Sequence, residues 1–187
     1  MTSKPCCLVV GILVCLASIA PLRAEIASFP KDQPVFKTEI PSGYAATQTE
    51  TSLYLRPTAA DTSRYADASN YFFAFIALPA SDVSDEASAK KYVESYRASE
   101  LKKLNMEEEK TPWPVAEEEL PNGLKGWSAD SDSFLKINKG DLPQMRAFTA
   151  IVFSPNGKDY YLMEAFGLSG AAAANKDFLK KSIVAAK

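Results

Sequence analysis

The sequence contains no histidine, and its three cysteines all lie within the first 15 residues, at Cys6, Cys7 and Cys15. Ser-His-Asp and Cys-His nucleophile systems both need an imidazole as the base, so this chain excludes them. Zinc sites built from histidine and cysteine are excluded for the same reason. No glycine-rich phosphate loop and no nucleophile elbow appears in the sequence either. The commonest hydrolase and zinc-enzyme classes therefore do not apply.

The first 24 residues have the pattern of a secretory signal peptide. Lys4 supplies a positive start, residues 6–20 form a continuous apolar run, and Ala24 is a small residue suited to a cleavage site. The run is shorter than the roughly 20 apolar residues of a membrane-spanning helix. We expect cleavage after Ala24 and export to the periplasm or out of the cell, and a retained anchor is the alternative. The exported chain would then have no thiol and no disulfide.

An excess of positive charge is also missing. The whole chain has a net charge of -2, and removal of Lys4 and Arg23 with the leader leaves 19 basic and 23 acidic residues. Nucleic-acid-binding domains present clustered basic surfaces, so we expect no nucleic-acid partner. Apolar residues make up 47% of the chain, an ordinary value for a folded protein. Residues 25–187 are therefore expected to form a single domain with its own core.

A long apolar hairpin at residues 147–167 is the most prominent feature that is present. Two apolar runs flank Pro155-Asn156-Gly157, and an Asn-Gly pair between such runs is a strong hairpin signal. Both alternating faces of each run are apolar, which is typical of strands that are buried on both sides. Residues 71–78 form a second run of this kind. The sequence predicts that the hairpin lies at the centre of a covered sheet.

The other segments complete an α+β pattern. After a capping Ser84 or Asp85, apolar residues recur at three- and four-residue spacing up to Leu104, which predicts an amphipathic helix. A second helix is expected within residues 169–187. Strands are expected at 34–40, at 44–55, at 134–137 and in a hairpin around Pro121-Asn122-Gly123, with a lead-in at 25–33 and a linker at 106–110. We predict one mostly antiparallel sheet with helices on both faces, an α/β/α sandwich.

This order of elements resembles the PsbP-like α/β/α sandwich superfamily. The residues that carry the resemblance are Phe36, Ile40-Pro41, Gly43-Tyr44, Asp159-Tyr160-Tyr161-Leu162, Phe178-Leu179 and Ser182-Ile183. The superfamily includes a photosystem lumenal protein, a nuclear Ran-binding factor and many exported bacterial proteins. The resemblance implies an exported bacterial member that binds a partner, with no shared catalytic centre and no cofactor. The histidine-based metal contacts of the photosynthetic members have no counterpart in a chain without histidine.

Four residues of the second predicted hairpin are candidates for a partner surface: Trp113, Glu117, Glu119 and Trp127. Tryptophan is enriched at binding hot spots, and here two tryptophans have acidic neighbours. The alternative is that both rings belong to the core, because tryptophan is usually mostly buried.

Two other patterns would favour an enzyme. Asp130-Ser131-Asp132 offers carboxylates to calcium, although the following glycine and acidic residue of a calcium loop are missing. Glu117 and Glu119 share one face of a strand, as a catalytic carboxylate pair requires. We expect an exported, non-catalytic binding or accessory protein of the cell envelope, with another envelope protein as its partner. The alternatives are a carboxylate-dependent or calcium-assisted hydrolase and a structural subunit of an envelope assembly.

Overall fold

The computed structural model describes residues 25–58, 72–108, 113–135 and 144–184. Those residues form two α-helices, α1 (Glu86–Lys103) and α2 (Ala172–Lys181), and one 3-10 turn (Pro121–Gly123). The strands are β1 (Ile26–Phe29), β2 (Phe36–Glu39), β3 (Tyr44–Gln48), β4 (Ser52–Pro57), β5 (Phe72–Leu78), β6 (Met106–Glu108), β7 (Ala116–Glu119), β8 (Lys125–Leu135), β9 (Gln144–Phe153) and β10 (Tyr160–Leu168). The predicted signal peptide, residues 1–24, falls outside the described part of the chain.

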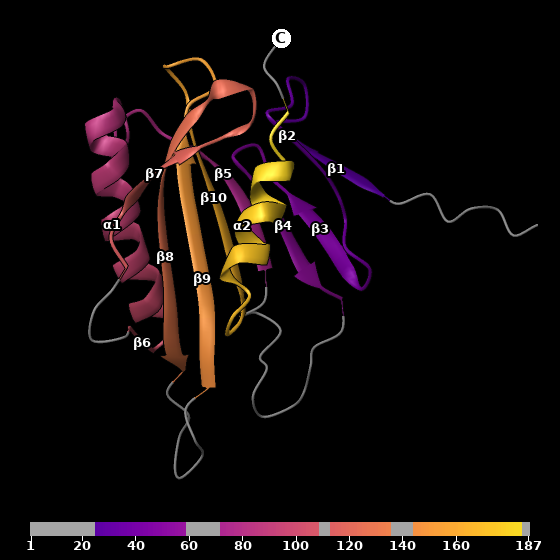
Figure 1. Cartoon of the computed structure of the whole chain (residues 1–187). Coiled ribbons are helices and arrows are strands. Elements are labelled where there is room, and N and C mark those ends of the chain that lie inside the picture. Colours follow the sequence, from indigo (N-terminus) through magenta and orange to yellow (C-terminus); the bar gives the residue numbers. More distant parts are fainter. Residues whose placement is uncertain (1–24, 59–71, 109–112, 136–143, 185–187) are drawn as a thin grey trace, which may run out of the picture.

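Eight of these strands form one sheet in the order β3-β4-β5-β10-β9-β8-β6, and β7 also pairs with β8. All the strand pairings within the described residues are antiparallel. The β9–β10 hairpin has β8 on one side and β5 on the other, so both of its strands are interior, as predicted (Figure 1). The predicted α+β class with a mostly antiparallel sheet is confirmed.

The two sides of β9 and β10 pack into two separate clusters of buried residues. Because strand side chains alternate, Phe148 and Val152 belong to one cluster and Ile151 to the other. The first cluster also contains Val93 of α1, and the second contains Leu179 of α2. Burial of both sides accounts for the apolar residues on both faces of these strands, and Arg146, Thr149 and Glu164 are the polar or charged residues buried among them.

A separate two-stranded sheet, β1 with β2, attaches to the second cluster through Phe36. The sequence analysis treats residues 25–33 only as a lead-in, but they contain β1. The Phe36 ring lies 4.8 Å from the ring of Phe75 and 5.6 Å from that of Phe153, measured between centroids. Both Phe36 and Phe29 are fully buried, so aromatic packing holds this small sheet against the main one.

The strand predicted over residues 44–55 is in fact a hairpin, β3 and β4. Thr49 makes the turn: its hydroxyl oxygen accepts hydrogen bonds from the backbone N–H of Thr51, at 3.3 Å, and of Ser52, at 3.1 Å. Threonine turns of this kind are weaker local signals than Gly, Pro or Asn turns. The Pro-Ser-Gly turn before β3 is present, with Gly43 at a φ of 80°.

Two further boundaries differ from the sequence prediction. Residues 106–108 are not a linker but a strand, β6, paired with the end of β8. Of the separate strand expected at 134–137, residues 134 and 135 are the end of β8, which runs unbroken from Lys125 to Leu135. Residues 136 and 137 lie outside the described part of the chain. β8 pairs with β9 over ten residue positions, and this long contact keeps its polar residues in the strand.

The predicted cap of the first helix is confirmed. The Asp85 carboxylate accepts a hydrogen bond from the Ser88 backbone N–H at 2.7 Å, and the Ser88 hydroxyl accepts one from the Asp85 N–H at 3.0 Å. α2 is shorter than predicted and ends at Lys181, after which Ile183 forms a β-bridge with Phe36. Among the helices that the structure describes, none has the length and apolar character needed to cross a membrane.

Candidate functional site

A cavity of about 240 Å³ lies where three elements meet: the first turns of α1, the β7–β8 hairpin and the β9–β10 hairpin. Its lining includes Glu86, Glu117, Lys125, Trp127 and Tyr160. We call this cavity the hairpin groove. It lies at the end of the sheet where the β9–β10 turn is found, at the top of Figure 1.

The register of β7 against β8 places the polar lining of the groove. Glu117 is the direct cross-strand partner of Trp127, so both side chains leave the sheet on the same side. The Trp127 ring is half-buried, and the Lys90 ammonium of α1 lies 5.3 Å from the ring centroid. Glu117 forms an exposed ion pair with Lys125, with 2.8 Å between the carboxylate oxygen and the Nζ. The groove thus combines aromatic faces with paired charges.

Negative charge predominates beside the buried ring of Tyr160. Burial raises the pKa of the Tyr160 hydroxyl, and the negative charges of Asp85 and Glu86 raise it further. Both carboxylates belong to the cap and first turn of α1, where they complement the helix dipole. The cap and first turn of α1 therefore add negative charge beside Tyr160.

The structure brings together two of the four residues predicted for a partner surface. Glu117 and Trp127 line the groove, whereas Trp113 and Glu119 are not part of its lining. Trp113 precedes β7 and is 42% exposed, and its backbone carbonyl accepts a hydrogen bond from Arg97 at 2.7 Å. Glu119 is exposed on β7, paired in register with Lys125. The partial burial of Trp127 agrees with the alternative that this ring belongs to the core.

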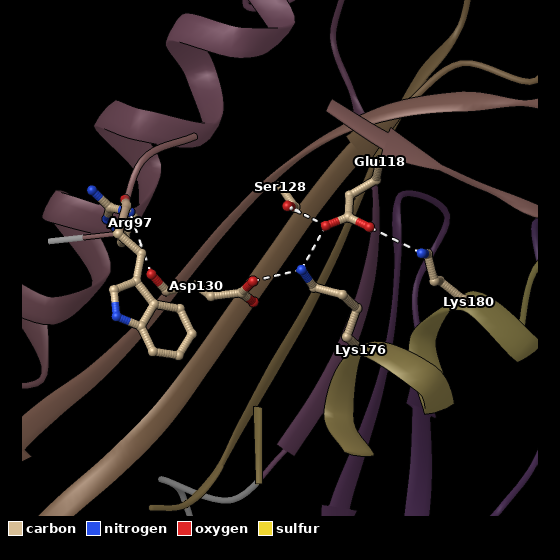
Figure 2. Close-up of polar contacts among 7 residues, drawn as sticks. Arg97, Glu118, Ser128, Asp130, Lys176 and Lys180 are labelled. Atoms are coloured by element: carbon tan, nitrogen blue, oxygen red, sulfur yellow. Dashed lines mark hydrogen bonds and ion pairs between the residues drawn. The ribbon is translucent and has the colours of Figure 1, made fainter. Parts of the chain in front are cut away.

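Glu118, which lies between the two predicted glutamates, is the best connected of the three. Its carboxylate accepts a hydrogen bond from Ser128 at 2.8 Å and forms ion pairs with Lys176 at 2.5 Å and Lys180 at 2.9 Å. Figure 2 shows Glu118 between Ser128 of β8 and the two lysines of α2. The Glu118 side chain is only 14% exposed. These contacts fasten α2 to the β7–β8 hairpin.

Replacing Glu118 with glutamine should destabilise the fold by about 1–3 kcal/mol at neutral pH, because both lysines lose a charged hydrogen-bond partner. Burial alone would raise the pKa of Glu118, but hydrogen bonds from Lys176, Lys180 and Ser128 lower it to about 2, from an ordinary 4.5. A lowered pKa contributes stability above pH 4.5 that is lost as the pH falls towards 2. Urea unfolding between pH 7 and pH 2.5 measures this loss, which E118Q should lack.

The matched control is Glu117→Gln on the same strand. Its ion pair with Lys125 joins side chains that are 49% and 72% exposed, so we expect a change below about 1 kcal/mol. Equal effects of E117Q and E118Q would contradict the fastening role of Glu118.

The proposed calcium ligands Asp130 and Asp132 lie within β8 and not in a loop. Asp130 instead forms an ion pair with Lys176, at 2.6 Å between its Oδ2 and the ammonium (Figure 2). Within residues 25–58, 72–108, 113–135 and 144–184, no three acidic side chains converge as a metal site would require. The lysine therefore supplies the positive charge beside Asp130.

A buried carboxylic acid, Glu164, is the unusual group that the sequence analysis does not single out. Glu164 lies in the middle of β10 and is 2% exposed. Its cross-strand partners, Ala74 of β5 and Ala150 of β9, are both small and fully buried. Tyr96 of α1 donates a hydrogen bond to the carboxylate, and burial raises the pKa of Glu164 to about 7. One charged residue within an apolar strand face was the available signal.

Comparison with known proteins gives only a distant likeness. No family model matches the chain, and no curated protein matches it. A crystal structure from Bacteroides thetaiotaomicron has 10% identity and a TM-score of 0.43, with 82% of this chain covered but only 46% of that protein. A variant of the protein Mog1 has 15% identity and a TM-score of 0.42, with 83% of this chain and 84% of that one covered.

The Ran-binding protein Mog1p of Saccharomyces cerevisiae has 16% identity and a TM-score of 0.42, with 82% of this chain and 83% of that one covered. These TM-scores are below 0.5, so no functional property of the three proteins is transferred to this chain. Its function has to be inferred from its own residues.

Proposed function

We propose that this chain is an exported, non-catalytic binding or accessory protein of the cell envelope, periplasmic or secreted. The signal-peptide pattern of residues 1–24 supports export. The resemblance to the PsbP-like superfamily supports partner binding, and the partner we propose is another envelope protein. Part of that resemblance lies in a defined turn, in which the Tyr44 N–H donates to the Pro41 carbonyl at 3.0 Å.

The same proposal includes an α/β/α arrangement, with α1 and α2 on opposite faces of the sheet. Support comes from the alternation of β9 and β10, whose side chains divide between two buried clusters. Val93 of α1 belongs to one cluster and Leu179 of α2 to the other. Two helices on one face would share a cluster.

The observation that carries the binding role is the pair of cavities on either side of the β9–β10 turn. Ser154 and Gly157 line the hairpin groove, whereas Pro155, Asn156 and Asp159 line a larger cavity of about 1280 Å³. That larger cavity is completed by the β1–β2 connection and the β3–β4 turn. A turn with a cavity on each side offers convex and concave surface against which another protein can pack with shape complementarity.

The turn itself is held in one conformation by Asn156. Its side-chain oxygen accepts hydrogen bonds from the backbone N–H groups of Lys158, at 2.9 Å, and of Asp159, at 2.8 Å. Gly157 supplies the left-handed conformation, with a φ of 72°. A turn that is ordered before binding loses little conformational entropy in a complex, which favours affinity.

Site-specific photo-crosslinking tests this proposal. A photoreactive amino acid replaces Lys158, at the exposed turn, in the tagged full-length chain expressed in its own host. The matched control carries it at Lys102, an exposed lysine near the other end of α1. We expect one defined protein adduct in the envelope fraction from position 158 and none from position 102.

No adduct from position 158, or the same adducts from both positions, would contradict a binding role for the turn. A hydrolase would be favoured instead by turnover of an ester, glycoside or phosphate that disappeared in the Glu117→Gln variant.

A further inference from the structure

We propose that the edge strand β3 pairs with β3 of a second copy of this chain, antiparallel and across a two-fold axis at Ala46. The inference does not depend on the binding role proposed above, because it concerns one edge of the sheet and not the β9–β10 turn. Three observations support it: the outward backbone groups of β3, the absence of charge on this strand and its fit to itself.

The outer side of β3 presents unpaired backbone groups. β3 is the outermost strand of the main sheet, at the end opposite β6, and its residues 45–48 are exposed (Figure 1). Residues of an antiparallel pair alternate between hydrogen-bonded and non-hydrogen-bonded positions. The Thr58 N–H donates to the Gly43 carbonyl at 2.7 Å, so the odd-numbered residues of β3 bond to β4. The N–H groups of Ala46 and Gln48 therefore point away from β4, and the described residues supply them with no backbone partner.

The two edges of the main sheet differ in charge. β3 has the sequence Tyr-Ala-Ala-Thr-Gln, without a charged residue or a proline, and its register with β4 is continuous. The strands of the other edge, β6 and β7, are three and four residues long and contain two and three glutamates. Short, charged edge strands resist pairing with another chain, whereas a regular, neutral edge permits it. The β3 edge is therefore the one suited to extension of the sheet.

β3 is also complementary to itself. With the axis at Ala46, the Ala46 N–H of each copy would donate to the Ala46 carbonyl of the other, and the Gln48 N–H would donate to the Tyr44 carbonyl. The Tyr44 N–H already donates to the Pro41 carbonyl, at 3.0 Å, and this pairing does not require it. No charged side chain opposes another across the pair. A two-fold dimer of this kind is closed, because each copy uses its β3 edge once.

Sedimentation equilibrium of the purified full chain tests the proposal. Pairing of one short strand buries little surface, so we expect a weak dimer. Between about 10 µM and about 1 mM the average mass should rise from that of one chain towards that of two. A mass that stays at one chain over this range, or species larger than a dimer that grow with concentration, would overturn the proposal.

Charge at position 46 tests the axis itself. Ala46→Lys and Ala46→Glu each place like charges opposite one another, so each variant alone should dimerise several-fold more weakly than the wild type. A mixture of A46K and A46E should dimerise more strongly than either variant, because opposite charges then meet at the axis. The matched control is Ala116→Lys, the same change at an exposed position of β7 on the other edge, which should leave dimerisation unchanged. Wild-type dimerisation of A46K, or a mixture no stronger than its components, would contradict an axis at Ala46.

Ala46→Pro gives a second test that leaves charge unaltered. Proline is tolerated on an edge strand where its missing N–H would face outward, so A46P should keep the circular dichroism spectrum of the wild type. It should remain a single chain at every concentration, because the N–H at the axis is gone. Its photo-crosslinking from position 158 should match that of the wild type, which separates this proposal from the binding role of the turn. A folded A46P that dimerises as the wild type does would exclude pairing through β3.

Discussion

Replacing Phe36 with alanine should lower the free energy of unfolding by about 3–5 kcal/mol, the range for a buried phenylalanine truncated to alanine. Phe36 is fully buried and contacts four other rings. Three of them, Phe75, Phe153 and Tyr161, belong to strands of the main sheet. The cavity left by the missing ring would lie where the β1–β2 sheet attaches, so collapse around it would require the small sheet to shift.

Urea denaturation followed by circular dichroism measures this loss. The matched control is Lys37→Ala, the neighbouring exposed position on β2, which should change stability by less than about 0.5 kcal/mol. A change below 1 kcal/mol in F36A, or similar changes in both variants, would mean that the small sheet is not fastened through Phe36.

The second large effect is a dependence of stability on pH that a Glu164→Gln variant should lack. Burial raises the pKa of Glu164 to about 7, against an ordinary 4.5 in the unfolded chain. Between these two values the folded protein binds more protons at Glu164 than the unfolded chain does. The contribution of this group to stability is therefore fully present below pH 4.5 and is lost as the pH rises through 7. The raised pKa corresponds to about 3 kcal/mol at most.

The groups around Glu164 explain why its carboxyl stays protonated. From α1, Tyr96 donates a hydrogen bond to the carboxylate, Glu100 opposes its ionisation, and Lys103 favours it weakly. From β4, Arg56 also favours the charged form. Burial outweighs the positive charges and the hydrogen bond from Tyr96, because water cannot reach a carboxylate that is 2% exposed.

Thermal unfolding of the wild type and of E164Q from pH 5 to pH 8 checks this prediction. We expect the wild type to lose stability with rising pH, and E164Q to lose much less over the same interval. Glu117→Gln, an exposed carboxylate, should retain the wild-type pH profile. Parallel profiles for the wild type and E164Q would show that Glu164 does not ionise within this range.

Local features of the fold were predictable because each depends on residues close together in the sequence. The Asp85 cap needs only Ser88, three residues away, and the β9–β10 turn needs only its Asn-Gly pair. β1 was missed because four residues paired with another short strand have no periodic pattern of their own. The Thr49 turn was missed because a hydroxyl oxygen replaces the usual glycine or proline.

The site was predictable only in part. Both Glu117 and Trp127 belong to one hairpin, so their adjacency follows from the Pro121-Asn122-Gly123 turn and the strand register. The assignment of Glu118 to two lysines about 60 residues further along the chain depends on where α2 packs. No pattern within the hairpin indicates which of three consecutive glutamates faces that helix.

By itself the sequence determined two things. The missing histidine excludes nucleophile systems and zinc sites that depend on an imidazole, and apolar residues on both alternating faces identify the strands that are buried on both sides. Both are properties of composition and short spacing. The tertiary structure alone decided which charges are compensated: Glu118 meets lysines, whereas Glu164 faces alanines and a tyrosine. The free energy of a charge depends on burial and on neighbours from distant segments, and chain folding alone sets both.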